Sequence, residues 1–294
     1  MTEPRGFAWV LNLDAELELE KPSFNARTRF LEQLALYGAG SRALLGPRDV
    51  LLGDEKVGPD VAGRIGRAWC PTPRALARMR RARVIPEPHP SVEILRRVNH
   101  RLFAVELGGG LPDQHYVEGR AELEALLARR EHPWLLKRPL AFAGRGQQRA
   151  YGSLDEKQWS WVDASFKVSG LVVEPLVTPV LEVSLHGFVW PDRRHELGRI
   201  CVQEVSDRGV FRGIRLAQPH ELSETESLAL TNRATKVAGA VAVAGYFGPF
   251  GIDGYRYTLN GESRFCELGE INARYSMGFV TGFPVHPSEL SLDS

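Results

Sequence analysis

Apolar positions in the first third of the chain alternate between strand-like runs and helical spacing. Residues 7–13 (FAWVLNL) and 48–54 (RDVLLGD) predict buried strands, and residues 25–37 carry apolar side chains at helical spacing. A basic helix is expected to begin at Pro73 with Thr72 as its N-cap. The acidic segment 14–20 (DAELELE) predicts an exposed loop or strand end. This strand–helix alternation indicates a small α/β domain over residues 1–95.

A proline-rich stretch, residues 84–91 (VIPEPHPS), is typical of a linker and marks the first domain boundary. After it, residues 134–137 (WLLK) predict a short strand that runs into a glycine-bearing loop, AGRGQ. Ser153 and Glu156 have capping-box spacing, so a helix is expected to follow them. The strand predicted over residues 171–177 (LVVEPLV) contains a proline, which confines it to an edge or to a change of chain direction. We assign residues 96–179 to a second unit.

Residues 180–294 form the third predicted unit. Residues 181–190 predict a strand, and residues 223–244 predict a long helix with a Ser223–Glu226 capping box. Two further strands are expected to be joined by a hairpin at Asn260-Gly261. In the last of them, alternation places Glu270, Asn272 and Arg274 on one face and Glu267 on the other.

Composition excludes several classes of function. The chain has 37 Lys+Arg against 36 Asp+Glu, so no global charge argues for nucleic acid or an anionic membrane. The basic run from Arg78 to Arg83 lacks interleaved aromatic residues and is typical of a solvated helix face. The three cysteines form no CxxC pair, which fits a reducing cytoplasm. No signal peptide or membrane span is expected.

The face with Glu270, Asn272 and Arg274 is the first candidate site. A carboxylate and an amide oxygen two residues apart suit a hard divalent cation such as Mg²⁺, and the arginine would reach an anion held on it. The alternative is an amphipathic strand whose polar face is solvated. Taken singly, the strand lysine Lys137 and the strand acid Glu182 also have ordinary structural explanations.

The order of these features resembles that of the ATP-grasp superfamily over about residues 95–280. The resembling features are Lys137, the glycine loop, the Glu174-Pro175 step, Glu182, Asp253 and the Glu270-x-Asn272 pair. Residues 1–95 are similar to the pre-ATP-grasp domain that usually comes first. The resemblance implies a fold of the α/β (α+β) class, with two α+β subdomains that clamp ATP.

The resemblance also implies residue roles. Lys137 would contact the phosphates of ATP, and the loop with Gly144, Arg145 and Gly146 would close over them. The adenine would meet Glu174, Leu176 and Val177, and the ribose would meet Glu182. Asp253, Glu270 and Asn272 match the Mg²⁺ ligands, and Arg274 matches the arginine on the transferred phosphate. The family usually has a lysine where this chain has Arg101, which could supply that charge.

The implied activity is ADP-forming ligation of a carboxylate to an amine through an acyl phosphate, with small-molecule substrates, ATP and Mg²⁺. Two alternatives remain at this point: an ATP-binding scaffold without activity, and a kinase-like enzyme that stops at phosphoryl transfer. Cys201 and Cys266 are expected in the core rather than as nucleophiles, and His186 is either a strand histidine or a substrate contact. The sequence leaves homo-oligomerisation open.

Overall fold

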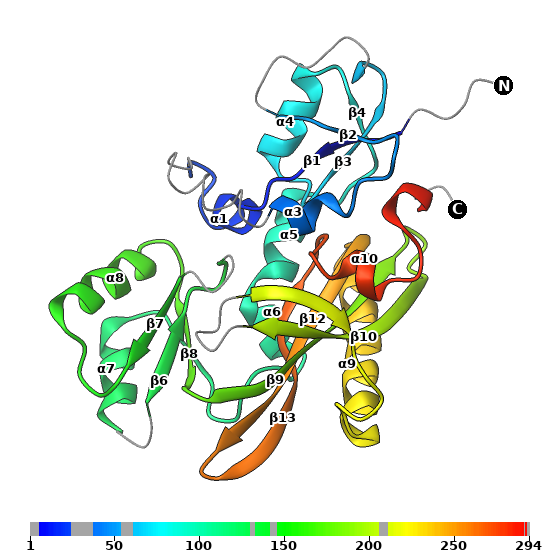
Figure 1. The fold of residues 1–294 in the computed structure, drawn as a ribbon. Helices are drawn as coiled ribbons and strands as arrows, with labels where there is room; N and C mark the ends of the chain where they lie inside the picture. Colours follow the sequence, from blue (N-terminus) through cyan, green and yellow to red (C-terminus); the bar gives the residue numbers. More distant parts are fainter. Residues whose placement is uncertain are drawn as a thin grey trace.

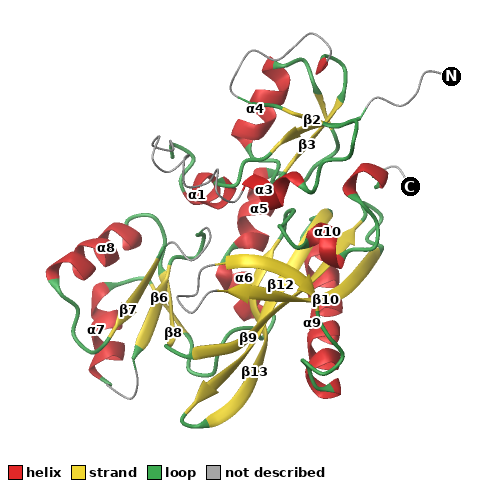
Figure 2. Cartoon of the chain, in the orientation of Figure 1, coloured by secondary structure: helices red, strands yellow, loops and turns green. Residues whose placement is uncertain are grey.

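The computed structural model describes residues 6–24, 38–53, 61–129, 133–141, 146–205, 211–290 and 292. These residues form a mixed α/β protein, as the sequence predicts, and its strands make three sheets (Figures 1 and 2). The helix predicted over residues 25–37 lies outside the described residues. No described helix has both the length and the apolar character needed to cross a membrane.

The first sheet is parallel, with strand order β2-β1-β3-β4. Its strands are β1 (Ala8–Val10), β2 (Val50–Leu51), β3 (Ile65–Ala68) and β4 (Ile85–Pro86). Both strands predicted in this region are therefore present, although each is shorter than its apolar run. The predicted basic helix is α4 (Pro73–Arg81), which connects β3 to β4 as expected for a parallel pair.

The acidic segment is a helix, α1 (Ala15–Glu20), with Glu16 and Glu18 buried, so the prediction of an exposed loop or strand end is wrong. Glu18 accepts hydrogen bonds from Thr72 Oγ1 at 2.6 Å and from the backbone N–H of Arg74 at 2.9 Å. Thr72 therefore precedes α4 as predicted but does not cap it with its side chain, because Glu18 accepts that helix N–H instead.

The second sheet is antiparallel, with order β5-β8-β6-β7. Its strands are β5 (His115–Val117), β6 (Trp134–Lys137), β7 (Gln147–Ala150) and β8 (Leu171–Pro175). Helices α7 (Arg120–Ala128) and α8 (Glu156–Phe166) accompany it. The capping box of α8 is Asp155 with Gln158, so the predicted Ser153–Glu156 box is two residues too early. Pro175 ends β8, where the chain leaves this sheet for the next.

The third sheet is antiparallel, with order β11-β10-β9-β12-β13. Its strands are β9 (Thr178–Val189), β10 (His195–Val205), β11 (Phe211–Leu216), β12 (Gly248–Leu259) and β13 (Glu262–Asn272). Helix α9 (Glu224–Val243) packs on this sheet and has the predicted Ser223–Glu226 capping box. The hairpin at Asn260-Gly261 is also confirmed, with positive φ at both residues.

Helices α5 (Val92–Asn99) and α6 (Arg101–Glu106) lie at the centre of the molecule, between the three sheets (Figure 1). One apolar cluster joins Trp9 and Trp69 of the first sheet region to Phe188 of the third sheet and Phe279 near the end of the chain. The remaining short helices are α3 (Gly38–Arg42), α10 (Phe279–Gly282) and η2 (Pro287–Glu289). The boundary predicted after residue 95 falls inside α5, and the division into three units stays a prediction.

Candidate functional site

The end of β6 places Lys137 beside Glu174 of β8. Leu135 registers with Glu174 and Lys137 with Val172, so Lys137 and Glu174 lie on the same face as diagonal neighbours. Their side chains form an ion pair and are only 11% and 6% exposed. A nearly buried carboxylate needs such a partner because burial without one is costly. The residues expected at the phosphates and at the adenine are thus paired with each other in this structure.

The glycine loop is described only at its end, since Gly144 and Arg145 lie outside the described residues. Gly146 has a φ of +71°, a conformation that favours glycine. A Cβ at this position would lie 2.9 Å from the Cβ of Ala141. The Gly146 carbonyl accepts a hydrogen bond from the Arg138 N–H at 2.8 Å. This contact joins the end of the loop to the residue after Lys137.

The residues expected at the adenine and at the ribose lie where the chain passes from the second sheet to the third. The Leu176 N–H donates to the Pro133 carbonyl at 2.8 Å, and Val177 packs against a small apolar cluster with Leu111 and Tyr257. Glu182, on β9, registers with Tyr255 of β12. Burial raises the pKa of Glu182.

Strands β12 and β13 bring together the three predicted metal ligands. Asp253 registers with Glu270, and Gly251 registers with Asn272. Asn272 Nδ2 donates to Asp253 Oδ2 at 2.8 Å, and Gln203 of β10 donates to the other oxygen at 3.0 Å. Burial, together with the nearby charges of Glu270 and Glu182, raises the pKa of Asp253 to about 7. The negative charge at this position is therefore only partly compensated by the protein.

Arg101 connects this face to the second sheet. Its guanidinium lies 3.1 Å from Glu270 Oε1, and its Nε donates to the Arg138 carbonyl at 3.1 Å. The Arg101 side chain is only 8% exposed. A cation from α6 thus lies between the strand that ends in Lys137 and the acids of β13.

Arg274, immediately after β13, contacts the same face. Its Nη2 donates to Asn272 Oδ1 at 2.8 Å and its Nη1 donates to the Tyr275 carbonyl. Its Nε donates to Glu16 of α1, and the guanidinium lies 5.3 Å from the ring centroid of Trp69. Glu267 points away from this face and pairs with Arg233 of α9, as the alternation predicts.

Two residues at this site, Glu16 and Gln203, were not predicted. The AELELE segment alternates like a strand, so nothing in it indicated a buried helix that reaches Arg274. Gln203 is one polar residue in an ordinary strand, and it reaches Asp253 only because β10 and β12 both pair with β9. Neither residue could have been assigned to the site without knowledge of the tertiary packing.

The residues fit a magnesium ion. Mg²⁺ is commonly held by one or two protein carboxylates, with waters and substrate phosphates completing its shell. Asp253 and Glu270 supply two carboxylates and Asn272 an amide. Over the described ranges, no group of three or more His, Cys, Asp or Glu side chains is arranged to hold a metal, so the third protein ligand expected here is the amide of Asn272 rather than another acid.

His186, Cys201 and Cys266 are buried in the fold, in positions typical of residues with a structural role. His186 is 3% exposed and lies between two serines, with Nε2 3.1 Å from Ser184 Oγ and Nδ1 3.1 Å from Ser276 Oγ. Cys201 and Cys266 are buried free thiols, as expected for core residues. Burial raises the pKa of each thiol, so neither is prepared to act as a nucleophile.

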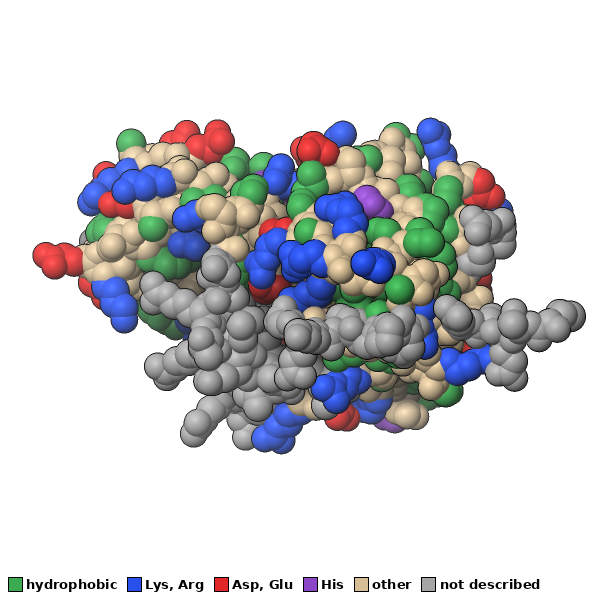
Figure 3. All heavy atoms as spheres, turned by 90° about the horizontal axis from the view of Figure 1, so that it is seen from above, with side chains coloured by type: hydrophobic (Ala, Val, Ile, Leu, Met, Phe, Trp, Pro, Cys, Tyr) green, Lys and Arg blue, Asp and Glu red, His purple; other side chains and the backbone are tan. Residues whose placement is uncertain are grey.

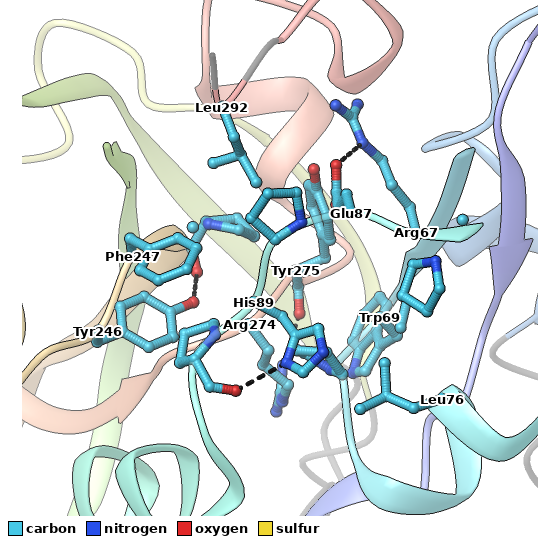
Figure 4. A pocket seen from close by; sticks show the side chains of 18 of the residues that line it. Arg67, Trp69, Leu76, Glu87, His89, Tyr246, Phe247, Arg274, Tyr275 and Leu292 are labelled. Atoms are coloured by element: carbon cyan, nitrogen blue, oxygen red, sulfur yellow. Dashed lines mark hydrogen bonds and ion pairs between the residues drawn. The ribbon is translucent and has the colours of Figure 1, made fainter. Parts of the chain in front are cut away.

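Two pockets lie near these residues. A small one of about 210 Å³ lies between the second and third sheets and is lined by Arg101, Gln114, Lys137 and Glu174 among others. A larger one of about 540 Å³ lies between the first sheet and later parts of the chain, and Arg274, His89 and Trp69 are among the residues that line it (Figure 4). Viewed from above, basic side chains gather in the middle of the molecule (Figure 3).

No family model and no curated protein sequence matches the chain. Several solved structures are similar to it. N5-carboxyaminoimidazole ribonucleotide synthetase from Thermus thermophilus is 20% identical with a TM-score of 0.55, covering 96% of this chain and 76% of that one. Biotin carboxylase from Campylobacter jejuni is 12% identical with a TM-score of 0.60, covering 93% and 66%.

D-alanyl-alanine synthetase A from Vibrio cholerae O1 is 10% identical with a TM-score of 0.57, covering 99% of this chain and 92% of that one. At such low identities the likeness concerns the fold, and it extends over nearly the whole chain. The fold that the sequence resemblance implies is therefore the one that the chain adopts.

Proposed function

Because the chain has the ATP-grasp fold, we propose that it is an ATP-dependent carboxylate–amine ligase. In this reaction a substrate carboxylate oxygen takes the γ-phosphoryl group of ATP, which gives ADP and an acyl phosphate. The amine nitrogen then attacks the carbonyl carbon and phosphate leaves. The product is an amide, and no covalent bond to the protein is needed.

The observation that carries the proposal is that Arg101 and Arg274 contact the residues of β13 proposed as metal ligands, while Lys137 lines the same small pocket as Arg101. Lys137 comes from the second sheet, Arg101 from α6 and Arg274 from the end of β13, and contacts link Arg101 to both Glu270 and the residue after Lys137. Phosphoryl transfer depends mainly on positioning and on neutralising the moving charge. This arrangement is suited to both.

We assign the nucleotide to the pocket between the second and third sheets. Lys137 and Arg101 would contact its phosphates, under the loop that contains Gly144, Arg145 and Gly146. The adenine would meet Glu174, Leu176 and Val177, and the ribose Glu182. Binding would exchange the Lys137–Glu174 ion pair for contacts with the nucleotide. Structures of similar fold solved with ADP or ATP support nucleotide binding by this chain.

Asp253, Glu270 and Asn272 would hold Mg²⁺, which supplies positive charge to the phosphates of ATP. The raised pKa of Asp253 supports this assignment, because a bound cation would offset the charge that burial leaves uncompensated. Arg274 would steady the transferred phosphoryl group. Its contact with Glu16 holds the guanidinium in place at the edge of this site.

The test is ADP release with ATP and Mg²⁺ across a panel of carboxylic acids and amines. We expect one pair to raise the rate and to yield an amide that mass spectrometry detects. ADP release that needs only a carboxylic acid, with a stable phosphorylated product, would favour the kinase-like alternative. Tight ATP binding without turnover on any pair would favour the scaffold and refute the ligase.

A further inference from the structure

The larger of the two pockets, of about 540 Å³, has no lining residue in common with the small pocket assigned to the nucleotide, over the part of the chain that the structure describes. One wall comes from β3, α4 and the segment 86–90, and the other from residues around the start of β12 and just after β13. Figure 4 shows Trp69 and Leu76 on one side of it, with Tyr246 and Phe247 opposite. The pocket is therefore a separate space between two parts of the fold.

Aromatic rings supply much of the lining of this pocket. They belong to Trp69, Phe188, Tyr246, Phe247 and Tyr275. Phe247 is half-buried, yet it belongs to none of the apolar clusters that the described residues form. Stacked or edge-to-face contact between aromatic rings is favourable beyond the area that it buries. The lining thus suits a ligand with a flat ring that packs on Phe247.

Trp69 adds a hydrogen-bond donor that the protein leaves unused. This residue is 2% exposed, and its Nε1 is buried without a hydrogen-bond partner. Its backbone is held on both sides, because its N–H donates to the Val10 carbonyl at 2.8 Å and its carbonyl accepts from the Tyr275 N–H at 3.0 Å. Buried donors in folded proteins nearly always have an acceptor, so this one needs an explanation. An acceptor atom on the ring of a bound molecule would supply the missing partner.

The two arginines that line the pocket have acidic partners. Arg67 pairs with Glu87 at 2.7 Å, and Arg274 pairs with Glu16. The other basic group of the lining is His89, whose Nδ1 lies 3.0 Å from the carbonyl of the next residue. Neither ion pair carries a net charge, so an ionised group inside the pocket would lose water without gaining a counter-ion. The lining therefore favours an uncharged ring.

Arg274 places this pocket beside the proposed reaction centre. It lines the pocket, and its Nη2 donates to Asn272 Oδ1 at 2.8 Å. Asn272 is one of the residues proposed to hold Mg²⁺, and Arg274 is the residue proposed to steady the transferred phosphoryl group. A molecule whose ring lies in the pocket would therefore have its Arg274 end close to the place where the acyl phosphate forms.

We propose that the larger pocket binds one of the two molecules that the ligase joins, and that this molecule carries an uncharged heteroaromatic ring with an acceptor for Trp69 Nε1. The ring packs on Phe247, and the reacting carboxylate or amine lies beside Arg274. The inference rests on the proposed function only in calling this molecule a substrate. Binding of the ring does not need turnover, so the two can be tested apart.

The test is calorimetric titration of the full chain with pyridine, pyrimidine and quinoline rings that each carry a carboxymethyl or an aminomethyl group. Each probe has two counterparts, which are the flat carbocycle without ring nitrogen and the saturated carbocycle. At least one heteroaromatic probe should bind saturably and about fivefold more tightly than its flat carbocycle, because only the heteroaromatic ring accepts from Trp69. The saturated ring should bind about fivefold more weakly again, because it cannot stack. The acid and amine series show which of the two substrates carries the ring.

Trp69→Phe keeps an aromatic ring and removes the N–H, so it should abolish the difference between the heteroaromatic probe and its flat carbocycle. Phe247→Leu should weaken the binding of both flat rings by about fivefold and leave that of the saturated ring nearly unchanged. Trp159→Phe makes the same substitution in α8, away from the pocket, and should leave all three affinities unchanged. Thermal melts check that the fold is kept, and Phe247→Leu alone decides the matter if Trp69→Phe does not fold.

Three results would overturn the ring site: no saturable binding by any heteroaromatic probe, equal binding of the saturated rings, or unchanged binding in a variant that keeps the fold. Saturable binding of the ring without ADP release in any acid–amine pair would instead overturn the ligase function and leave the site intact. ADP release and amide formation from substrates without a ring, unaffected by either variant, would do the reverse.

Discussion

The carboxylate of Glu270 combines two effects: it pairs with Arg101, and its charge raises the pKa of Asp253. Glu270→Gln should lower Mg²⁺-dependent ADP release by at least about 100-fold, because the ion loses a charged ligand and the transferred phosphoryl group then loses the positive charge of the ion. The Glu270 side chain is 31% exposed, so the melting temperature should change little. Glu262→Gln, at a 69% exposed position of the same strand, is the matched control. Wild-type turnover in Glu270→Gln would refute its assignment as a metal ligand.

His186 should make the fold sensitive to acid. Burial lowers its pKa from 6.5 to about 4. The unfolded chain takes up the proton near its ordinary pKa while the folded chain does not, so the free energy of unfolding falls between these values. The loss is at most about 3 kcal/mol.

Urea denaturation at about pH 7 and about pH 4.5 measures this effect. In His186→Gln the loss on acidification should be smaller, whatever the variant costs at neutral pH. His195→Gln changes an exposed histidine and should keep the wild-type loss. An unchanged acid response in His186→Gln would contradict the prediction.

Residues whose position follows from strand alternation could be predicted from the sequence. Glu270, Asn272 and Arg274 share a face as expected, and Glu267 lies on the other. Residues that reach this face from distant segments could not. Glu16 meets Arg274 across more than two hundred positions of the chain, a contact that local patterns do not encode.

At the scale of elements, α1 is the main error of the sequence interpretation. Alternating leucines and glutamates favour a strand, but tertiary contacts override this preference. The carboxylates of Glu16 and Glu18 find partners in Arg274 and Thr72, and Arg96 Nε donates to the carbonyl of Leu19 at 2.8 Å. Elements with strong local signals, such as α9 and the β12–β13 hairpin, were predicted correctly.

Two glycine substitutions, one in the β12–β13 hairpin and one in α9, should change the stability of the fold in opposite directions. Gly261 has a φ of +82°, and a Cβ added there would meet no atom within 4 Å, so Gly261→Ala should cost about 1 kcal/mol of unfolding free energy through backbone strain alone. Gly239 lies inside α9 and also has open space around it. Gly239→Ala should raise the unfolding free energy by about 1 kcal/mol, because alanine favours a helix more than glycine does. Chemical denaturation measures both. Effects of the same sign would contradict this account.

At the scale of the whole molecule, packing between sheets was beyond sequence reasoning. Each of the three sheets arises from one continuous stretch of the chain. The core, however, joins Trp9 and Trp69 to Phe279 near the other end of the chain. Such contacts depend on the complementarity of distant surfaces, which hydrophobic periodicity does not specify.

Arg67 should be one of the residues that hold the two ends of the chain together. It is 3% exposed on β3, pairs with Glu87 at 2.7 Å, and donates to the carbonyls of Pro287 and Leu290. Arg67→Met should lower the unfolding free energy by about 3 kcal/mol, since it leaves a carboxylate and two carbonyls without their donor. Glu87→Gln should lower the unfolding free energy by less, because Glu87 is 21% exposed and Arg67 still donates to both carbonyls in this variant.

The two variants should also differ in where the structure loosens. Hydrogen exchange should quicken at residues 283–290 in Arg67→Met, because that segment loses its donor from β3, and much less in Glu87→Gln. Arg120→Met breaks exposed ion pairs with Glu124 and Asp163 and a contact with the Trp159 ring, and should change the unfolding free energy by no more than about 1 kcal/mol. Equal exchange at residues 283–290 in Arg67→Met and the wild type would show that the apolar core alone holds the C-terminal segment to the first sheet.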